Sequence, residues 1–192
     1  GDMSAGSPGC AAGAPHDREA AELQADLLAW IGTAPPGFVA AGGSRAARYG
    51  LAAGAAAALE REFETLAHRL FVHQYARVPV YRAYCDALGR GPGQVERAAE
   101  IPALPVEAFK KGRIATFPAA REQLCFHTSG TTADRPGVLH LDGTALYDLA
   151  LERGFRHHVL PDRGSIRMLS LVPGRDEAPH SSLSYMLERV RQ

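Results

Sequence analysis

The apolar positions in the first half of the chain recur at helical spacing. A first segment has an acidic start at Asp17, and its apolar residues approximate one face of a short amphipathic helix. A second, longer helix is predicted from about Tyr49 to Tyr75, with an apolar side opposite a charged side. Pro79 interrupts this pattern. A shorter helix is expected from Val80 to Leu88, ended by Gly89.

The pattern changes in the second half, where short apolar runs separate the helical stretches. The prolines of Ile101–Pro105 predict an extended segment, because a residue before proline is pushed out of the helical region. A brief helical turn is expected at Val106–Lys110. Two short strands are predicted at Leu124–Thr128 and Val138–Leu141, with an exposed polar turn between them. A buried strand is predicted at Ile166–Val172, a largely apolar run bounded by glycine and proline.

One more helix follows the predicted hairpin. Asp142 is expected to cap a helix that extends to about His157. Its expected inward-facing residues are Leu146, Leu149, Ala150 and Phe155. A loop and a final helix come after the buried strand. The fold class is therefore α/β, with a helical N-terminal lead-in followed by strand–helix alternation.

The chain divides into three parts by composition. Residues 1–16 are rich in Gly, Ala, Ser and Pro and predict a disordered leader. Residues 17–48 contain the short helix and a Gly- and Pro-rich linker, and residues 49–192 form the remaining domain. The opening Gly1-Asp2-Met3 and a terminal helical pattern without a stop signal suggest that the natural protein is longer.

Charge and cysteine content exclude several classes of protein. Lys plus Arg and Asp plus Glu are both 21, so no net field attracts nucleic acid or an anionic membrane. The three cysteines are widely spread and lack a CxxC spacing, which favours a reducing cytoplasm over a disulfide framework. No apolar run approaches the roughly 18 residues of a membrane span, and no signal peptide is evident.

The chemistry-bearing stretch is the run from Phe126 to Thr132, between the two predicted strands. It concentrates hydroxyl groups and one glycine at a turn, where backbone N–H and side-chain O–H groups can converge on an anion such as phosphate. A plain Ser/Thr turn is the simpler alternative. A Walker loop is excluded, because Lys110 and Lys111, the only lysines, precede the run.

The run Thr128-Ser129-Gly130-Thr131-Thr132 resembles the phosphate-binding signature of the adenylate-forming superfamily. Upstream, Ile101–Lys110 resembles the "IP-x-LP-x-x-x-FK" stretch of the acyl-protein synthetase (LuxE-like) family. The resemblance extends from Phe63 to the end of the chain. It implies an N-terminal portion of an adenylate-forming fold, in a cytoplasmic protein.

That resemblance implies a ligase that uses ATP and Mg²⁺. A fatty acid or other carboxylic acid becomes an acyl adenylate and then passes to an enzyme cysteine, which in the family lies beyond the last residue of this chain. An acyl reductase or an acyl carrier is the implied protein partner. The 192-residue chain alone is therefore expected not to complete the transfer. Thr128, Ser129, Gly130, Thr131 and Thr132 are the expected phosphate-binding residues, and no residue is assigned as catalytic.

Two alternatives stay open. The acyl acceptor can instead be coenzyme A or a carrier protein. The chain can also be a non-catalytic remnant or interaction module, because Ala133 replaces the usual second glycine and Asp134–Gly137 does not reproduce the usual Pro-Lys-Gly.

Weaker candidates lie near the run. His127, His180 and Ser181 are possible pocket residues, and Lys110 and Lys111 are candidate phosphate contacts beside a simpler role as solvated lysines. Cys125 is expected to be a buried strand cysteine. The adjacent His157 and His158 point to different helix faces, so they predict a solvated helix end, and no metal site is expected.

Overall fold

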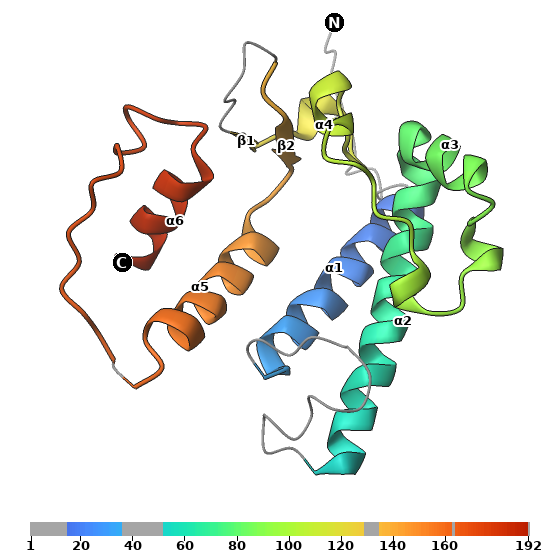
Figure 1. Cartoon of the computed structure of the whole chain (residues 1–192), viewed down its shortest axis with the longest axis horizontal. Helices are drawn as coiled ribbons and strands as arrows, with labels where there is room; N and C mark the ends of the chain where they lie inside the picture. The colour runs from blue at the N-terminus through green and yellow to red at the C-terminus, as the bar shows by residue number, and fades with distance from the viewer. Residues whose placement is uncertain (1–14, 36–51, 129–134, 163, 192) are drawn as a thin grey trace, which may run out of the picture.

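The computed structural model describes residues 15–35, 52–128, 135–162 and 164–191. Two long helices, α1 (Pro15–Thr33) and α2 (Ala53–Arg77), lie side by side (Figure 1). An ion pair of 2.6 Å between Arg69 and Asp26 joins them. Helix α1 begins two residues inside the predicted leader; the rest of that leader and most of the predicted linker lie outside the described residues.

The buried core lies between α2 and the short helix α3 (Pro79–Ala87). Pro79 occupies the first turn of α3, where its missing N–H costs no hydrogen bond, and Gly89 follows the helix at φ 63°. The predicted break and stop are therefore confirmed. The buried residues of this core cluster are Phe71, Val78, Tyr81, Cys85 and Val95.

The segment around Ile101–Pro105 packs against this core. The Tyr81 hydroxyl donates a 2.8 Å hydrogen bond to the Pro102 carbonyl, and Ile101 and Leu104 pack against the core cluster. The chain reaches this segment through two short 3-10 helices, η2 (Pro92–Gln94) and η3 (Ala98–Glu100). It then enters α4 (Ala108–Lys111), the predicted helical turn, and η4 (Ala119–Arg121).

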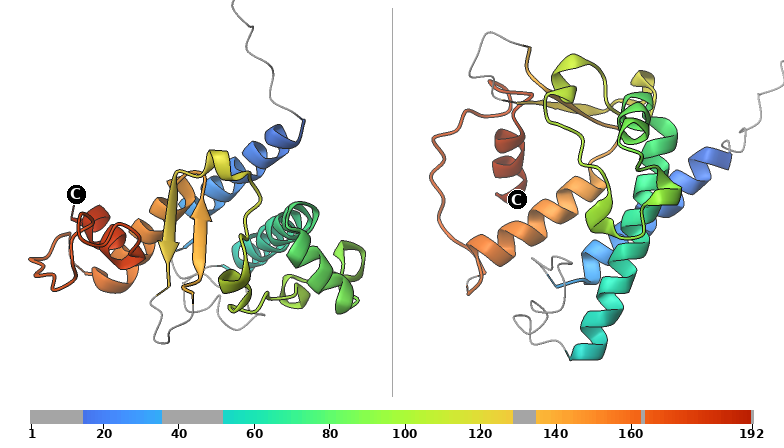
Figure 2. Two further views of the ribbon diagram at one scale, coloured as in Figure 1. Left: turned by 90° about the horizontal axis from the view of Figure 1, so that it is seen from above. Right: turned by 45° about the vertical axis from the view of Figure 1, so that its right-hand side comes forward.

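The sheet is one antiparallel pair, β1 (Leu124–His127) and β2 (Val138–Leu141), as predicted. Figure 2 shows the pair lying between the C-terminal segment on one side and α2 and α3 on the other. The Cα partners run from Leu124 with Leu141 to His127 with Val138. The described part of the chain is thus mostly helical with a small two-stranded sheet.

Helices α5 (Ala145–Val159) and α6 (Ser182–Val190) complete the C-terminal region, and α5 packs on both α1 and α6. Arg153 of α5 donates to the carbonyls of Gly32 and Ala34 at the end of α1, at 2.6 and 2.7 Å. The prediction that Asp142 caps α5 is wrong. Thr144 is the N-cap residue, and Asp142 instead accepts from Arg121 at 2.9 Å.

The predicted buried strand at Ile166–Val172 is also wrong. These residues form no strand, and Leu169 and Leu171 are 89% and 92% exposed. A buried strand needs a hydrogen-bonded neighbour on each edge. The described sheet contains β1 and β2 alone, and neither pairs with this segment. Of the four predicted inward-facing residues of α5, Ala150 is exposed and the other three are half-buried.

None of the helices in the described ranges combines the length and the apolar character that crossing a membrane requires.

Candidate functional site

The two faces of the hairpin have different chemistry because side chains alternate along a strand. Phe126 projects to one face and is buried against Tyr147 and Tyr185, with ring centroids 5.2 and 5.4 Å away. Cys125 and His127 project to the other face, where the cross-strand partner of Cys125 is His140. The aromatic face therefore anchors the hairpin on α5 and α6 and presents the polar face outward.

Thr128 closes the described part of the hairpin. Its N–H donates to the Gly137 carbonyl and its Oγ1 accepts from the Gly137 N–H, both at 2.9 Å. A Cβ on residue 137 would lie 3.3 Å from that Oγ1 and 3.5 Å from the Phe109 Cβ, so a glycine suits this close approach. Because Oγ1 serves as the acceptor, the exposed hydroxyl keeps its proton to donate to a ligand.

The other four predicted phosphate-binding residues, Ser129, Gly130, Thr131 and Thr132, lie outside the described residues. The two strands predicted on either side of them are confirmed. Arg135 and Pro136, which re-enter the described chain just before β2, are both exposed.

A basic groove of about 390 Å³ adjoins the hairpin and is formed by α4, the residues after it and the start of β2. We call this set of side chains the basic groove, and its cationic members are Lys110, Lys111, Arg113 and Arg135. Arg113 is engaged by the Phe117 carbonyl and by Glu122. Within the described ranges, no carboxylate lies at ion-pair distance from the other three cations, so their charge is available to an anion.

Glu122, two residues before β1, contacts two of the side chains that line this groove. Its Oε2 lies 2.7 Å from His140 Nδ1 and 3.4 Å from Arg113. Burial alone would raise the pKa of Glu122, but the hydrogen bonds and charges of His140 and Arg113 together lower it. The carboxylate is thus ionised at neutral pH and holds His140 and Arg113 in place.

A cysteine and two histidines meet on the same polar face. The Sγ of Cys125 lies 3.3 Å from His180 Nδ1 and 4.0 Å from His127 Nε2, and the two imidazole rings stack at 4.3 Å. The His127 N–H donates to the His180 carbonyl at 2.9 Å, which fixes residue 180 beside β1. Burial, and then the charge of Glu122, raises the pKa of the Cys125 thiol.

These positions correct part of the sequence analysis. Cys125 is on β1 as expected but is only half-buried, because its thiol faces His180 rather than a core. Ser181 is the N-cap of α6, where its Oγ accepts from the Ser184 N–H at 3.2 Å, and its predicted place in a pocket stays a prediction. His157 and His158 are exposed in the last turn of α5, as predicted.

Sequence reasoning missed the grouping of Cys125 with His127 and His180. The Cys-x-His spacing on a predicted strand was the available signal, because residues two apart share a face. His180 is 55 residues away from Cys125 in sequence, and only the folded chain brings it to β1.

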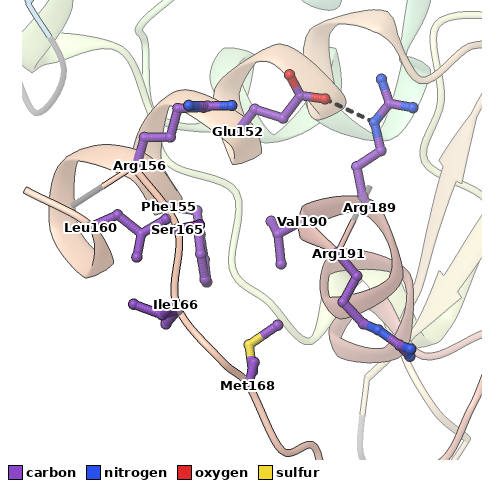
Figure 3. Close-up of a pocket in the computed structure, with 11 residues that line it drawn as sticks. Glu152, Phe155, Arg156, Leu160, Ser165, Ile166, Met168, Arg189, Val190 and Arg191 are labelled. Carbon is purple, nitrogen blue, oxygen red and sulfur yellow. Dashed lines mark hydrogen bonds and ion pairs between the residues drawn. The ribbon is translucent and has the colours of Figure 1, made fainter.

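A second cavity, of about 590 Å³, lies between α5, residues 164–168 and the end of α6. Figure 3 shows Phe155, Met168 and Val190 around it, with the ion pair of Glu152 and Arg189 at 2.9 Å on its edge. The α5 residues that line this cavity belong to the second half of the helix, whereas the hairpin precedes the start of α5 in the chain. The two sites are therefore separate.

Comparison of the chain with protein-family models, with curated proteins and with solved structures found no match.

Proposed function

We propose that the chain belongs to an ATP-dependent, AMP-forming ligase that activates a fatty acid or another carboxylic acid. The proposal rests on one observation. The two stretches that resemble the acyl-protein synthetase family adjoin in space, since Phe109 of α4 packs against the Thr128–Gly137 closure of the hairpin. Thr128, the first residue of the hydroxyl-rich run, therefore lies against Gly137, which also approaches Phe109 of the basic groove.

The proposed first step forms an acyl adenylate. A carboxylate oxygen of the acid attacks the α-phosphorus of ATP, the bond from that phosphorus to the bridging oxygen breaks, and pyrophosphate leaves. The negative charge that develops on pyrophosphate needs positioned donors. Thr128 can donate its hydroxyl proton, and Lys110, Lys111 and Arg135 can contribute positive charge.

The residues around the hairpin suit a magnesium nucleotide. Three cations without carboxylate partners among the described residues complement a polyphosphate. Thr128, hydrogen-bonded to Gly137 next to the groove residue Pro136, adds a hydroxyl donor. Mg²⁺ bound to the phosphates supplies further charge neutralisation. Glu122 is occupied by His140 and Arg113, so it is not assigned as a ligand of this ion.

In the proposed second step, a thiolate attacks the acyl carbonyl carbon and AMP leaves. Cys125 is not assigned this role, because burial, and then the charge of Glu122, raises the pKa of its thiol, which disfavours the nucleophilic thiolate. The acceptor is then either another cysteine or the thiol of coenzyme A or of a carrier protein. The proposal covers both kinds of acceptor.

The test is carboxylate-dependent exchange of labelled pyrophosphate into ATP by the protein. We expect exchange only when a fatty acid is present. Replacing Thr131 and Thr132 together by Ala removes two hydroxyl contacts, each worth about 0.5–1.5 kcal/mol and more toward a charged phosphate, so exchange should fall at least about tenfold.

The matched control is Thr65→Ala, which removes an exposed hydroxyl bonded only to its own helix. Its exchange rate should equal that of the unmodified protein. No exchange with any carboxylic acid would contradict the proposed reaction. Undiminished exchange in the double variant would contradict the assignment of the two threonines.

A further inference from the structure

The cluster of Cys125, His127 and His180 lies beside the hairpin turn and is independent of the proposed ATP chemistry. Strand alternation places Cys125 and His127 on one face of β1, and the backbone hydrogen bond from His127 to His180 brings the third residue alongside. We propose that these three side chains bind a single Zn²⁺ ion, or a divalent cation of similar softness.

The distances fit one shared ion. Zn–S and Zn–N bonds of about 2.3 and 2.0–2.1 Å at a tetrahedral angle separate the sulfur and nitrogen ligands by roughly 3.6 Å. The two measured sulfur–nitrogen distances, 3.3 and 4.0 Å, lie on either side of that value. The three ligand atoms all lie within 4.8 Å of one another.

The ligand set selects the metal. A thiolate with two imidazoles suits zinc, whereas magnesium and calcium take oxygen ligands. Both histidines are exposed, so the stacked rings can turn about their side-chain bonds to direct one lone pair each at the ion. Three protein ligands leave one tetrahedral position open to water or to a ligand oxygen, as in catalytic zinc sites.

Two other groups in the chain show what a purely structural arrangement looks like. Cys85 is fully buried in the aromatic core cluster beside Tyr81. His157 and His158 are sequence neighbours whose rings meet edge to face, with no cysteine in the described chain grouped with them. Cys125, His127 and His180 differ from both, because their donor atoms converge at a surface that solvent ions can reach.

The first test is titration of the chain with Zn²⁺ in competition with a chromophoric chelator. We expect a single site, with affinity reduced at least about tenfold in each of Cys125→Ser, His127→Gln and His180→Gln, since loss of even an outer partner of a ligand has an effect of that order. His158→Gln removes an exposed histidine outside the cluster and should bind like the unmodified chain. Equal Zn²⁺ affinity in all four variants would overturn the proposal.

The second test uses Co²⁺ as a spectroscopic substitute. A sulfur-to-cobalt charge-transfer band should appear with the unmodified chain and with His158→Gln, and should be lost in Cys125→Ser. Far-ultraviolet circular dichroism of every variant checks the fold, which exposed and isosteric replacements should preserve. A band that persists in Cys125→Ser, or that never forms in the folded unmodified chain, would refute the site.

Discussion

The α2–α3 region and the region from β1 to α6 bury their apolar side chains to different extents. The first encloses Phe71 and Cys85 almost completely within one cluster. In the second, Phe126 and Ser184 are the only buried side chains of the described elements β1, β2, α5 and α6, while Leu169 and Leu171 are nearly fully exposed. The helical region therefore contains a buried cluster, although Val80 and Leu88 beside it are about half exposed, whereas the C-terminal region leaves Leu169 and Leu171 nearly fully exposed.

The difference in burial reflects how far apart in sequence the residues that must pack together lie. Residues of a helical pair meet over short sequence distances and need only one another. A buried strand needs partners on its edges, and the Ile166–Val172 run finds none in the described sheet. The run is apolar in sequence, but it has no strand partner among the described elements, and Leu169 and Leu171 are exposed.

The largest expected effect follows directly from this contrast. Phe71→Ala should lower the free energy of unfolding by about 3–5 kcal/mol, because it removes a buried ring and leaves a cavity. Leu171→Ala should change it by less than about 0.5 kcal/mol, since the side chain is exposed. Urea denaturation of the two variants measures both. Comparable losses would show that Leu171 is buried in solution and would contradict the difference in burial between the two regions.

An intermediate effect is expected where the C-terminal region is joined to α1. Arg153→Ala removes two charge-assisted hydrogen bonds to carbonyls at the end of α1, so the free energy of unfolding should fall by roughly 1.5–3 kcal/mol. Arg156→Ala, an exposed arginine on the same helix, is the matched control and should be near neutral. A loss no greater in the first variant than in the second would mean that this junction does not hold the regions together.

The smallest expected effect is the acid sensitivity of the hairpin. The pKa of Glu122 is lowered below its ordinary value of about 4.5, so its contribution to stability is present above that value and disappears as pH falls through the lowered one. Glu122→Gln should therefore lose less stability than the unmodified chain between neutral and acidic pH, whereas exposed Glu177→Gln should behave like the unmodified chain. Identical pH profiles for Glu122→Gln and the unmodified chain would show that Glu122 does not stabilise the hairpin in a pH-dependent way.

Local signals explain what the sequence could predict. The break at Pro79, the stop at Gly89 and the strands of the hairpin each depend on residues within a few positions of one another, and all are confirmed. The cap assigned to Asp142 is wrong because Arg121 competes for its carboxylate. That competitor is 21 residues away, beyond any local rule.

The candidate site likewise has one part that local sequence predicts and another part that depends on tertiary packing. The polar turn and its flanking strands follow from the order of residues, whereas the basic groove requires α4 to pack against β2. The approach of His180 to Cys125 requires the return of the chain after α5. Spacing predicts which residues share a strand face, and only tertiary packing determines what is brought to that face.

The most direct test of a phosphate site at the hairpin is calorimetric titration of the chain with pyrophosphate at low ionic strength. The unmodified chain should bind, and Lys110→Gln/Arg135→Gln should bind at least about tenfold more weakly, because two charged donors are lost. Arg61→Gln, an exposed arginine of α2, should bind like the unmodified chain. Absence of binding, or equal binding by the unmodified chain and the double variant, would contradict the assignment of the basic groove and the hairpin turn to phosphate.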